Sequence, residues 1–127
     1  MLVVGTYFEL LAVNRALMEV RFLGSGVDDA VRGSPPLADV HSRLIDELIA
    51  YHHGRGEAEK VASWERWRVF GARAIEIQSI LEYLSPLWPS LDSEDLKRQV
   101  LETQMRPFVY ESDDVDRLYR ELERGLR

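Results

Sequence analysis

Apolar residues recur every three or four positions along most of the chain, which is the period of an α-helix. The most sustained run lies in the proline-free segment from Glu57 to Leu84. Its apolar positions are Trp67, Phe70, Ala74, Ile77, Leu81 and Leu84. This spacing places all six side chains on one face of a helix. The pattern therefore predicts one long central helix over about residues 57–84.

Capping residues and breakers predict where the other helices begin and end. Thr6 and Glu9 have the spacing of a capping box, and Ser34 precedes a proline that suits the first position of a helix. Asp92 or Ser93 begins the next capped segment, and Ser112 the last. We expect helices over residues 7–23, 36–53, 93–105 and 112–127. Residues 24–36 form the longest loop, with a helical turn at 27–32. The prediction is an all-α, single-domain bundle of about five helices over residues 1–127.

Composition narrows the chemistry. The chain has 127 residues and no cysteine, which excludes disulfides, thiol catalysis and cysteine–zinc sites. No apolar run reaches the ~18 residues of a membrane span, and the apolar start carries no basic leader. The net charge is −6 and no segment is rich in basic residues, so binding to the phosphates of nucleic acid is disfavoured. We expect a cytoplasmic protein that binds neither membranes nor nucleic acid.

All three histidines lie in one segment, residues 41–53. His41 and His52 share a helix face but are separated by roughly 16 Å along the axis, too far to hold one metal ion. We expect His41 to be a packing residue, and His52 and His53 to benefit from the negative end of their helix. The alternative is a metal or catalytic site in which His41 meets carboxylates from other helices, such as Glu9.

Two regions are candidates for binding a partner. The acidic residues of segment 111–116 either cap the final helix or form a surface for a basic protein. These are Glu111, Asp113, Asp114 and Asp116. The predicted long helix also has a second apolar stripe, ending at Tyr83 and interrupted by Glu76. Trp88, between two prolines, is either a plug for the core or an exposed anchor.

No catalytic motif is present. The glycine-rich segment lacks the lysine of a phosphate loop, and neither a Gly-x-Ser-x-Gly elbow nor a His-Glu-x-x-His pair occurs. The sequence therefore favours a non-enzymatic protein-interaction module without metal or cofactor. Its most concrete form is a toxin-neutralising protein, immunity-like or antitoxin-like, that binds a basic partner. The alternatives are the small metal-binding protein or enzyme built on His41, and a homo-oligomeric structural subunit pairing through helix 57–84.

Overall fold

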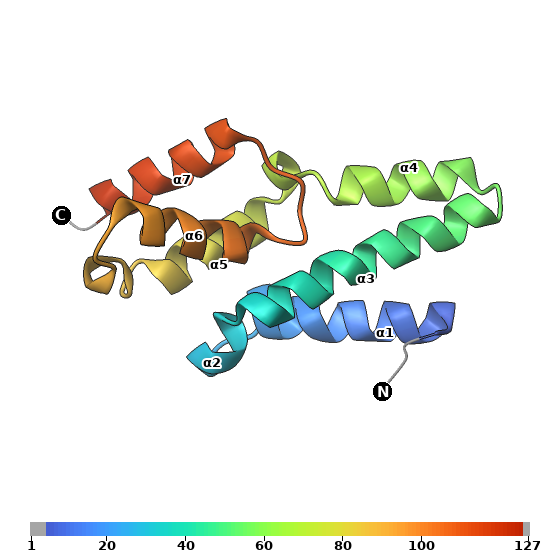
Figure 1. The fold of residues 1–127 in the computed structure, drawn as a ribbon, viewed down its shortest axis with the longest axis horizontal. Helices are drawn as coiled ribbons and strands as arrows, with labels where there is room; N and C mark the ends of the chain where they lie inside the picture. The colour runs from blue at the N-terminus through green and yellow to red at the C-terminus, as the bar shows by residue number, and fades with distance from the viewer. Residues whose placement is uncertain (1–4, 126–127) are drawn as a thin grey trace.

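The computed structural model describes residues 5–125, and these residues form helices joined by short links (Figure 1). The α-helices are α1 (Tyr7–Met18), α2 (Asp29–Arg32), α3 (Pro35–Gly54), α4 (Ala58–Trp67), α5 (Ala74–Leu84), α6 (Glu94–Met105) and α7 (Ser112–Arg124). Three shorter helical turns are η1 (Glu19–Leu23), η2 (Phe70–Ala72) and η3 (Trp88–Ser90). The prediction of an all-α fold is confirmed, but about five helices is too few, because residues 5–125 form seven α-helices.

Most of the predicted helix starts are confirmed. The Thr6 hydroxyl accepts from the Glu9 N–H and the Glu9 carboxylate accepts from the Thr6 N–H, which is the capping box. Ser34 and Ser93 likewise accept backbone N–H groups of the helices they precede. The last helix differs by one residue, because Glu111 rather than Ser112 occupies the cap position.

The predicted long helix over residues 57–84 is wrong. The chain leaves the helix after Trp67 and starts a new helix, α5, at Ala74. In between, the Phe70 N–H donates to the Val109 carbonyl at 3.0 Å, and the Val109 N–H donates to the Arg68 carbonyl at 2.7 Å. These backbone groups pair with the link between α6 and α7 instead of with a preceding helical turn. The alternative of a homodimer that pairs through helix 57–84 rests on one continuous helix, and residues 57–84 form two α-helices instead.

Helix η1 continues α1 as a π-helical turn, in agreement with the prediction of one helical run to Leu23. The Gly24 N–H donates to the Glu19 carbonyl at 2.6 Å, a bond that spans five residues instead of four. The turn directs Arg21 and Phe22 inward, with 1% and 3% of their surfaces exposed. It contacts both α2 and α5.

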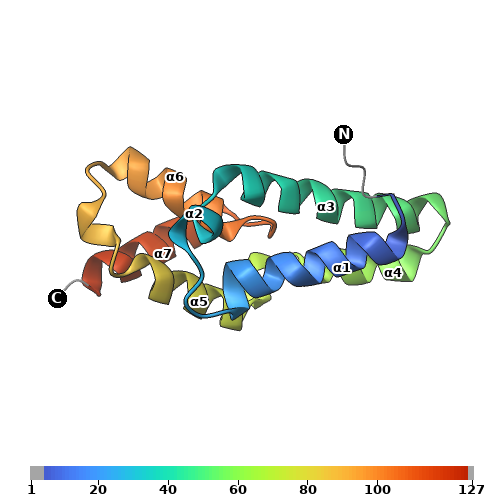
Figure 2. The same ribbon diagram turned by 90° about the horizontal axis from the view of Figure 1, so that it is seen from below.

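The helices form two packed groups. Helices α1, α3 and α4 lie together at one end of the molecule, and α5, α6 and α7 lie at the other (Figures 1 and 2). The first group buries Leu10, Leu17, Leu44, Ile45 and Leu48. The core of the second group is larger and also takes in Met18 of α1 and Phe22 of η1. It consists of Met18, Phe22, Phe70, Ile80, Leu84, Trp88, Leu101, Met105, Phe108, Val115, Leu118 and Leu122. Trp67 packs against both clusters.

The final helix buries Val115, Leu118 and Leu122, as its apolar spacing predicts, whereas Leu126 lies outside the described residues. Of the helices in residues 5–125, none has the length and apolar character needed to cross a membrane.

Candidate functional site

His41 is fully buried between Asn14 and Arg21. Its Nδ1 lies 2.9 Å from Arg21 Nη1 and its Nε2 lies 2.8 Å from Asn14 Oδ1. A guanidinium can only donate, so Nδ1 accepts and the ring proton sits on Nε2. Burial, followed by the charges of Arg21 and Arg68, lowers the pKa of His41 to about 3. The imidazole is therefore neutral at pH 7.

These contacts disfavour a site built from His41 and carboxylates. Both ring nitrogens already have protein partners, and neither partner is a carboxylate. Glu9, the suggested completing residue, is exposed and caps α1. Across residues 5–125, no three His, Cys, Asp or Glu side chains gather closely enough to form a metal-ligand group.

Arg21 joins the two groups of helices. Its Nη1 donates to the Arg106 carbonyl at 2.6 Å and its Nη2 to the Thr103 carbonyl at 2.9 Å, both at the end of α6. Burial, then the charges of Arg106 and Arg32, lowers the pKa of Arg21 to about 10, so it stays charged at pH 7. Its hydrogen-bond partners are all neutral, which makes it a structural cation rather than half of an ion pair.

His52 occupies a second buried position, in the last turn of α3 as predicted. It is 1% exposed, and its Nδ1 lies 3.2 Å from Glu57 Oε1. The rings of Tyr7 and Tyr51 meet the imidazole edge-on. Its buried Nε2 has no hydrogen-bond partner, while His53 is exposed.

Two of the partner-binding candidates are buried. Trp88 is 0% exposed and donates from Nε1 to Glu123 Oε1 at 3.2 Å, so it is a core residue and not an exposed anchor. Glu76 is 5% exposed and accepts from Arg73 Nη2 at 2.8 Å. Neither side chain is accessible to a partner in this structure.

The acidic candidates at the start of α7 have divided roles. The Asp114 carboxylate accepts from the Glu111 N–H at 2.9 Å, and Asp116 lies 2.9 Å from Arg98 Nη1. Glu111 and Asp113 are exposed. The interpretation of this segment as a helix cap thus fits Glu111, which is the N-cap residue, and Asp114, while the side chains of Glu111 and Asp113 are exposed on the surface.

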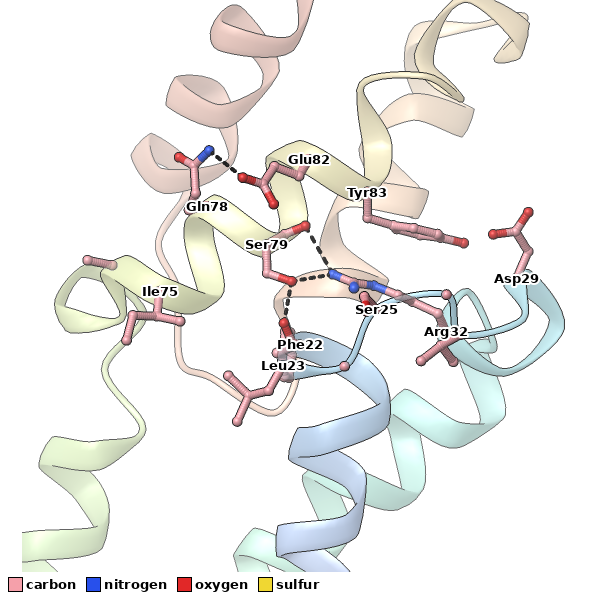
Figure 3. Close-up of a pocket in the computed structure, with 14 residues that line it drawn as sticks. Phe22, Leu23, Ser25, Asp29, Arg32, Ile75, Gln78, Ser79, Glu82 and Tyr83 are labelled. Atoms are coloured by element: carbon pink, nitrogen blue, oxygen red, sulfur yellow. Dashed lines mark hydrogen bonds between the residues drawn. The ribbon is translucent and has the colours of Figure 1, made fainter.

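A pocket of about 670 Å³ lies between residues 22–32 and one face of α5 (Figure 3). Helix α5 contributes Ala74 and a set of side chains with helical spacing, which are Ile75, Gln78, Ser79, Glu82 and Tyr83. The opposite side is formed by the glycine-rich link after η1 and by α2. Of the predicted site residues, only Tyr83 lines this pocket.

Arg32 anchors the floor of the pocket. It is 7% exposed, and its Nη2 donates to the Ser79 carbonyl at 3.0 Å and to the Ser79 hydroxyl at 2.7 Å. The same hydroxyl donates to the Phe22 carbonyl. The guanidinium lies 4.6 Å from the centre of the Tyr83 ring. Burial lowers the pKa of Arg32, although Tyr83 and Glu82 oppose that shift. These contacts fix α2 and η1 against α5.

Carboxylates and apolar side chains share the rim. Glu82 is exposed and accepts from Gln78 Nε2 at 3.1 Å, and Asp29 faces the Tyr83 hydroxyl (Figure 3). Burial and then Asp29 raise the pKa of Tyr83. Leu23 and Ile75 are 49% and 69% exposed, which is high for large apolar residues. The pocket thus offers acceptors for a cation next to an apolar wall.

The sequence held a signal for one half of this pocket. Residues 75, 78, 79, 82 and 83 share a helix face, but their mixed polarity does not resemble a core stripe. The other half is a loop whose position depends on contacts distant in sequence.

No protein-family model, curated protein or solved structure matches this chain.

Proposed function

We propose that this protein is a non-enzymatic interaction module of the cytoplasm that binds another protein. The observation that carries the proposal is the pairing of exposed apolar and acidic side chains around the α5 pocket. Leu23 and Ile75 expose apolar surface beside Glu82 and Asp29. Apolar centres with polar rims are typical of protein–protein interfaces. Leu23 and Ile75 line the same pocket, and exposed apolar side chains grouped at a pocket rimmed by polar residues often mark an interaction site.

The charge of the chain favours a basic partner. The net charge is −6, and the exposed Glu111 and Asp113 add a second acidic surface at the start of α7. Complementary charge accelerates association and suppresses wrong partners. The most concrete form of the proposal is a toxin-neutralising protein, immunity-like or antitoxin-like. Toxins that attack nucleic acids often present basic clefts, and an acidic partner gains association rate and specificity against such clefts.

Capture of the partner tests the proposal. The tagged protein is used as bait in its own cells, alongside an Ile75→Lys variant and a Leu96→Lys control. Ile75 lines the pocket, whereas Leu96 is a partly exposed apolar residue of α6. We expect the wild type and the control to enrich a protein with a basic surface, and Ile75→Lys to lose it. The absence of any enriched protein, or equal enrichment by all three, contradicts the proposal.

The toxin-neutralising form has its own test. The captured protein is expressed alone and then together with the wild-type chain. Growth arrest by the partner alone, relieved by co-expression, is the expected result. A partner that leaves growth unchanged on its own removes this form and leaves a general interaction module.

A further inference from the structure

We propose that the α5 pocket binds a lysine or arginine side chain of the partner protein. This inference rests on the proposed function and specifies the chemistry of the contact. Three features of the pocket support the inference: an apolar wall, carboxylates at the rim, and at the floor the guanidinium of Arg32, which is already hydrogen-bonded to Ser79.

The apolar wall suits the stem of a long basic side chain. Leu23, Val27 and Ile75 line the pocket, and Leu23 and Ile75 expose much of their surface. Lysine and arginine bury their methylene groups on such surfaces and keep the charged head among polar groups. A pocket of about 670 Å³ accommodates one such side chain together with the flanking backbone.

The rim supplies acceptors for the charged head. Glu82 is exposed and accepts a hydrogen bond from the neutral amide of Gln78 at 3.1 Å. Asp29 is exposed on the opposite side of the Tyr83 ring (Figure 3). Hydrogen bonds between a cationic donor and a carboxylate are about twice as strong as those between neutral groups.

The charge balance of the lining favours a cation over an anion. Two carboxylates, Asp29 and Glu82, line the pocket together with one guanidinium, that of Arg32. Arg32 is only 7% exposed. Its guanidinium donates a hydrogen bond to Ser79 and lies over the ring of Tyr83. Its charge therefore acts at the floor, whereas both carboxylates are exposed. An anionic side chain entering from solvent would meet those carboxylates first.

Titration with small model compounds tests the pocket without a partner. The ¹⁵N-labelled protein is titrated with the Nα-acetyl methylamides of lysine, arginine, norleucine and glutamate. Norleucine matches the lysine stem without its charge. We expect saturable amide shifts at Gly24, Ser79 and Glu82 with lysine or arginine, with a Kd on the order of millimolar. Norleucine and glutamate should cause much smaller shifts.

A matched pair of variants locates the effect. Glu82→Gln should weaken binding of the basic compounds about two- to five-fold, because a partly exposed ion pair contributes up to about that factor. Asp95→Asn, an exposed carboxylate change on α6, should leave binding unchanged. Both positions are exposed, so both variants should keep the amide spectrum of the folded protein outside the pocket.

The outcomes separate this inference from the proposed function. Absence of pocket shifts with both basic compounds, or equal shifts with glutamate, overturns the lysine or arginine pocket even if a partner is captured. Binding of the basic compounds that weakens about two- to five-fold in Glu82→Gln but not in Asp95→Asn supports the pocket even if the capture experiment yields no partner.

Discussion

Arg21 Nη1 lies 2.9 Å from His41 Nδ1, so a buried cation is paired with a neutral base instead of a carboxylate. The arrangement is stable only while the imidazole is neutral, because a protonated ring would place two positive charges in contact. Arg21 at the same time donates to the carbonyls of Thr103 and Arg106. One guanidinium therefore links α1 and α3 to the end of α6, and its loss should weaken the contact between the two groups of helices.

Replacing Arg21 with methionine tests that link. The change removes the donor to the Thr103 and Arg106 carbonyls, and each buried group left unpaired costs about 1–3 kcal/mol. We expect the free energy of unfolding to fall by at least about 2 kcal/mol, measured by urea denaturation. Arg15→Met, at an exposed arginine of α1, the helix that η1 continues, should change it by less than about 0.5 kcal/mol. Equal losses of unfolding free energy in the two variants would show that the buried hydrogen bonds of Arg21 do not stabilise the fold.

The pH dependence of stability should reveal His41. The unfolded histidine binds a proton near pH 6.5, whereas the folded one does so only near pH 3. Between these values the unfolded state holds more protons, so stability falls as the pH falls. The slope from this residue approaches about 1.4 kcal/mol per pH unit below pH 6.5, which gives about 1.6 kcal/mol from pH 6.5 to 5. His41→Gln should lose that part of the slope in urea denaturation, and identical slopes would contradict the assignment of a neutral ring.

Leucine-to-alanine changes test the two apolar cores. Leu48 and Leu118 are each 0% exposed, one in each cluster, and their replacement should cost about 2–5 kcal/mol of unfolding free energy. Leu81 is only partly buried, so its replacement should cost less. Thermal or urea denaturation of the three variants provides the comparison. Losses below about 1 kcal/mol at both buried positions would mean that the core is misplaced.

Charge changes at the start of α7 separate binding from folding. Asp113→Lys removes a favourable interaction with the helix dipole and should cost about 0.3–1 kcal/mol. Asp114→Lys should cost more, because it also removes the hydrogen bond to the Glu111 N–H. Binding kinetics with the captured partner should show slower association for Asp113→Lys, and the difference should shrink at high salt. An unchanged association rate would exclude this surface from the encounter.

Local signals predicted much of the fold, because helix starts depend on residues close in sequence. Thr6, Ser34 and Ser93 each cap the helix that follows them, as their positions indicate. The break after Trp67 is different. Phe70 and Ala74 continue the apolar period of a helix, yet the backbone at Phe70 bonds to Val109, about forty residues later. A contact between residues so far apart does not change the local spacing of apolar residues, so the sequence pattern cannot reveal it.

The site residues were harder to predict because burial is a tertiary property. Arg21 and Arg32 have the composition of surface residues, and nothing in their neighbourhood marks them as buried cations. The sequence around Trp88 is compatible with both a core and a surface position, and its side chain is buried because η3 packs against Tyr119 of α7. Tyr83 was identified as a candidate, but its pocket requires the loop after η1, whose course depends on Arg32 and Ser79.

The π-helical turn after Met18 makes the pocket sensitive to insertions and deletions. Because the Gly24 N–H bonds to the Glu19 carbonyl, this turn contains one residue more than an α-helical turn. Deleting one residue there would restore the α-helical period and rotate α1 by about 100° relative to everything after it. Arg21 and the Phe22 carbonyl could then no longer meet α6 and Ser79 together. The spacing of the chain at this point matters as much as the identity of any side chain around the pocket.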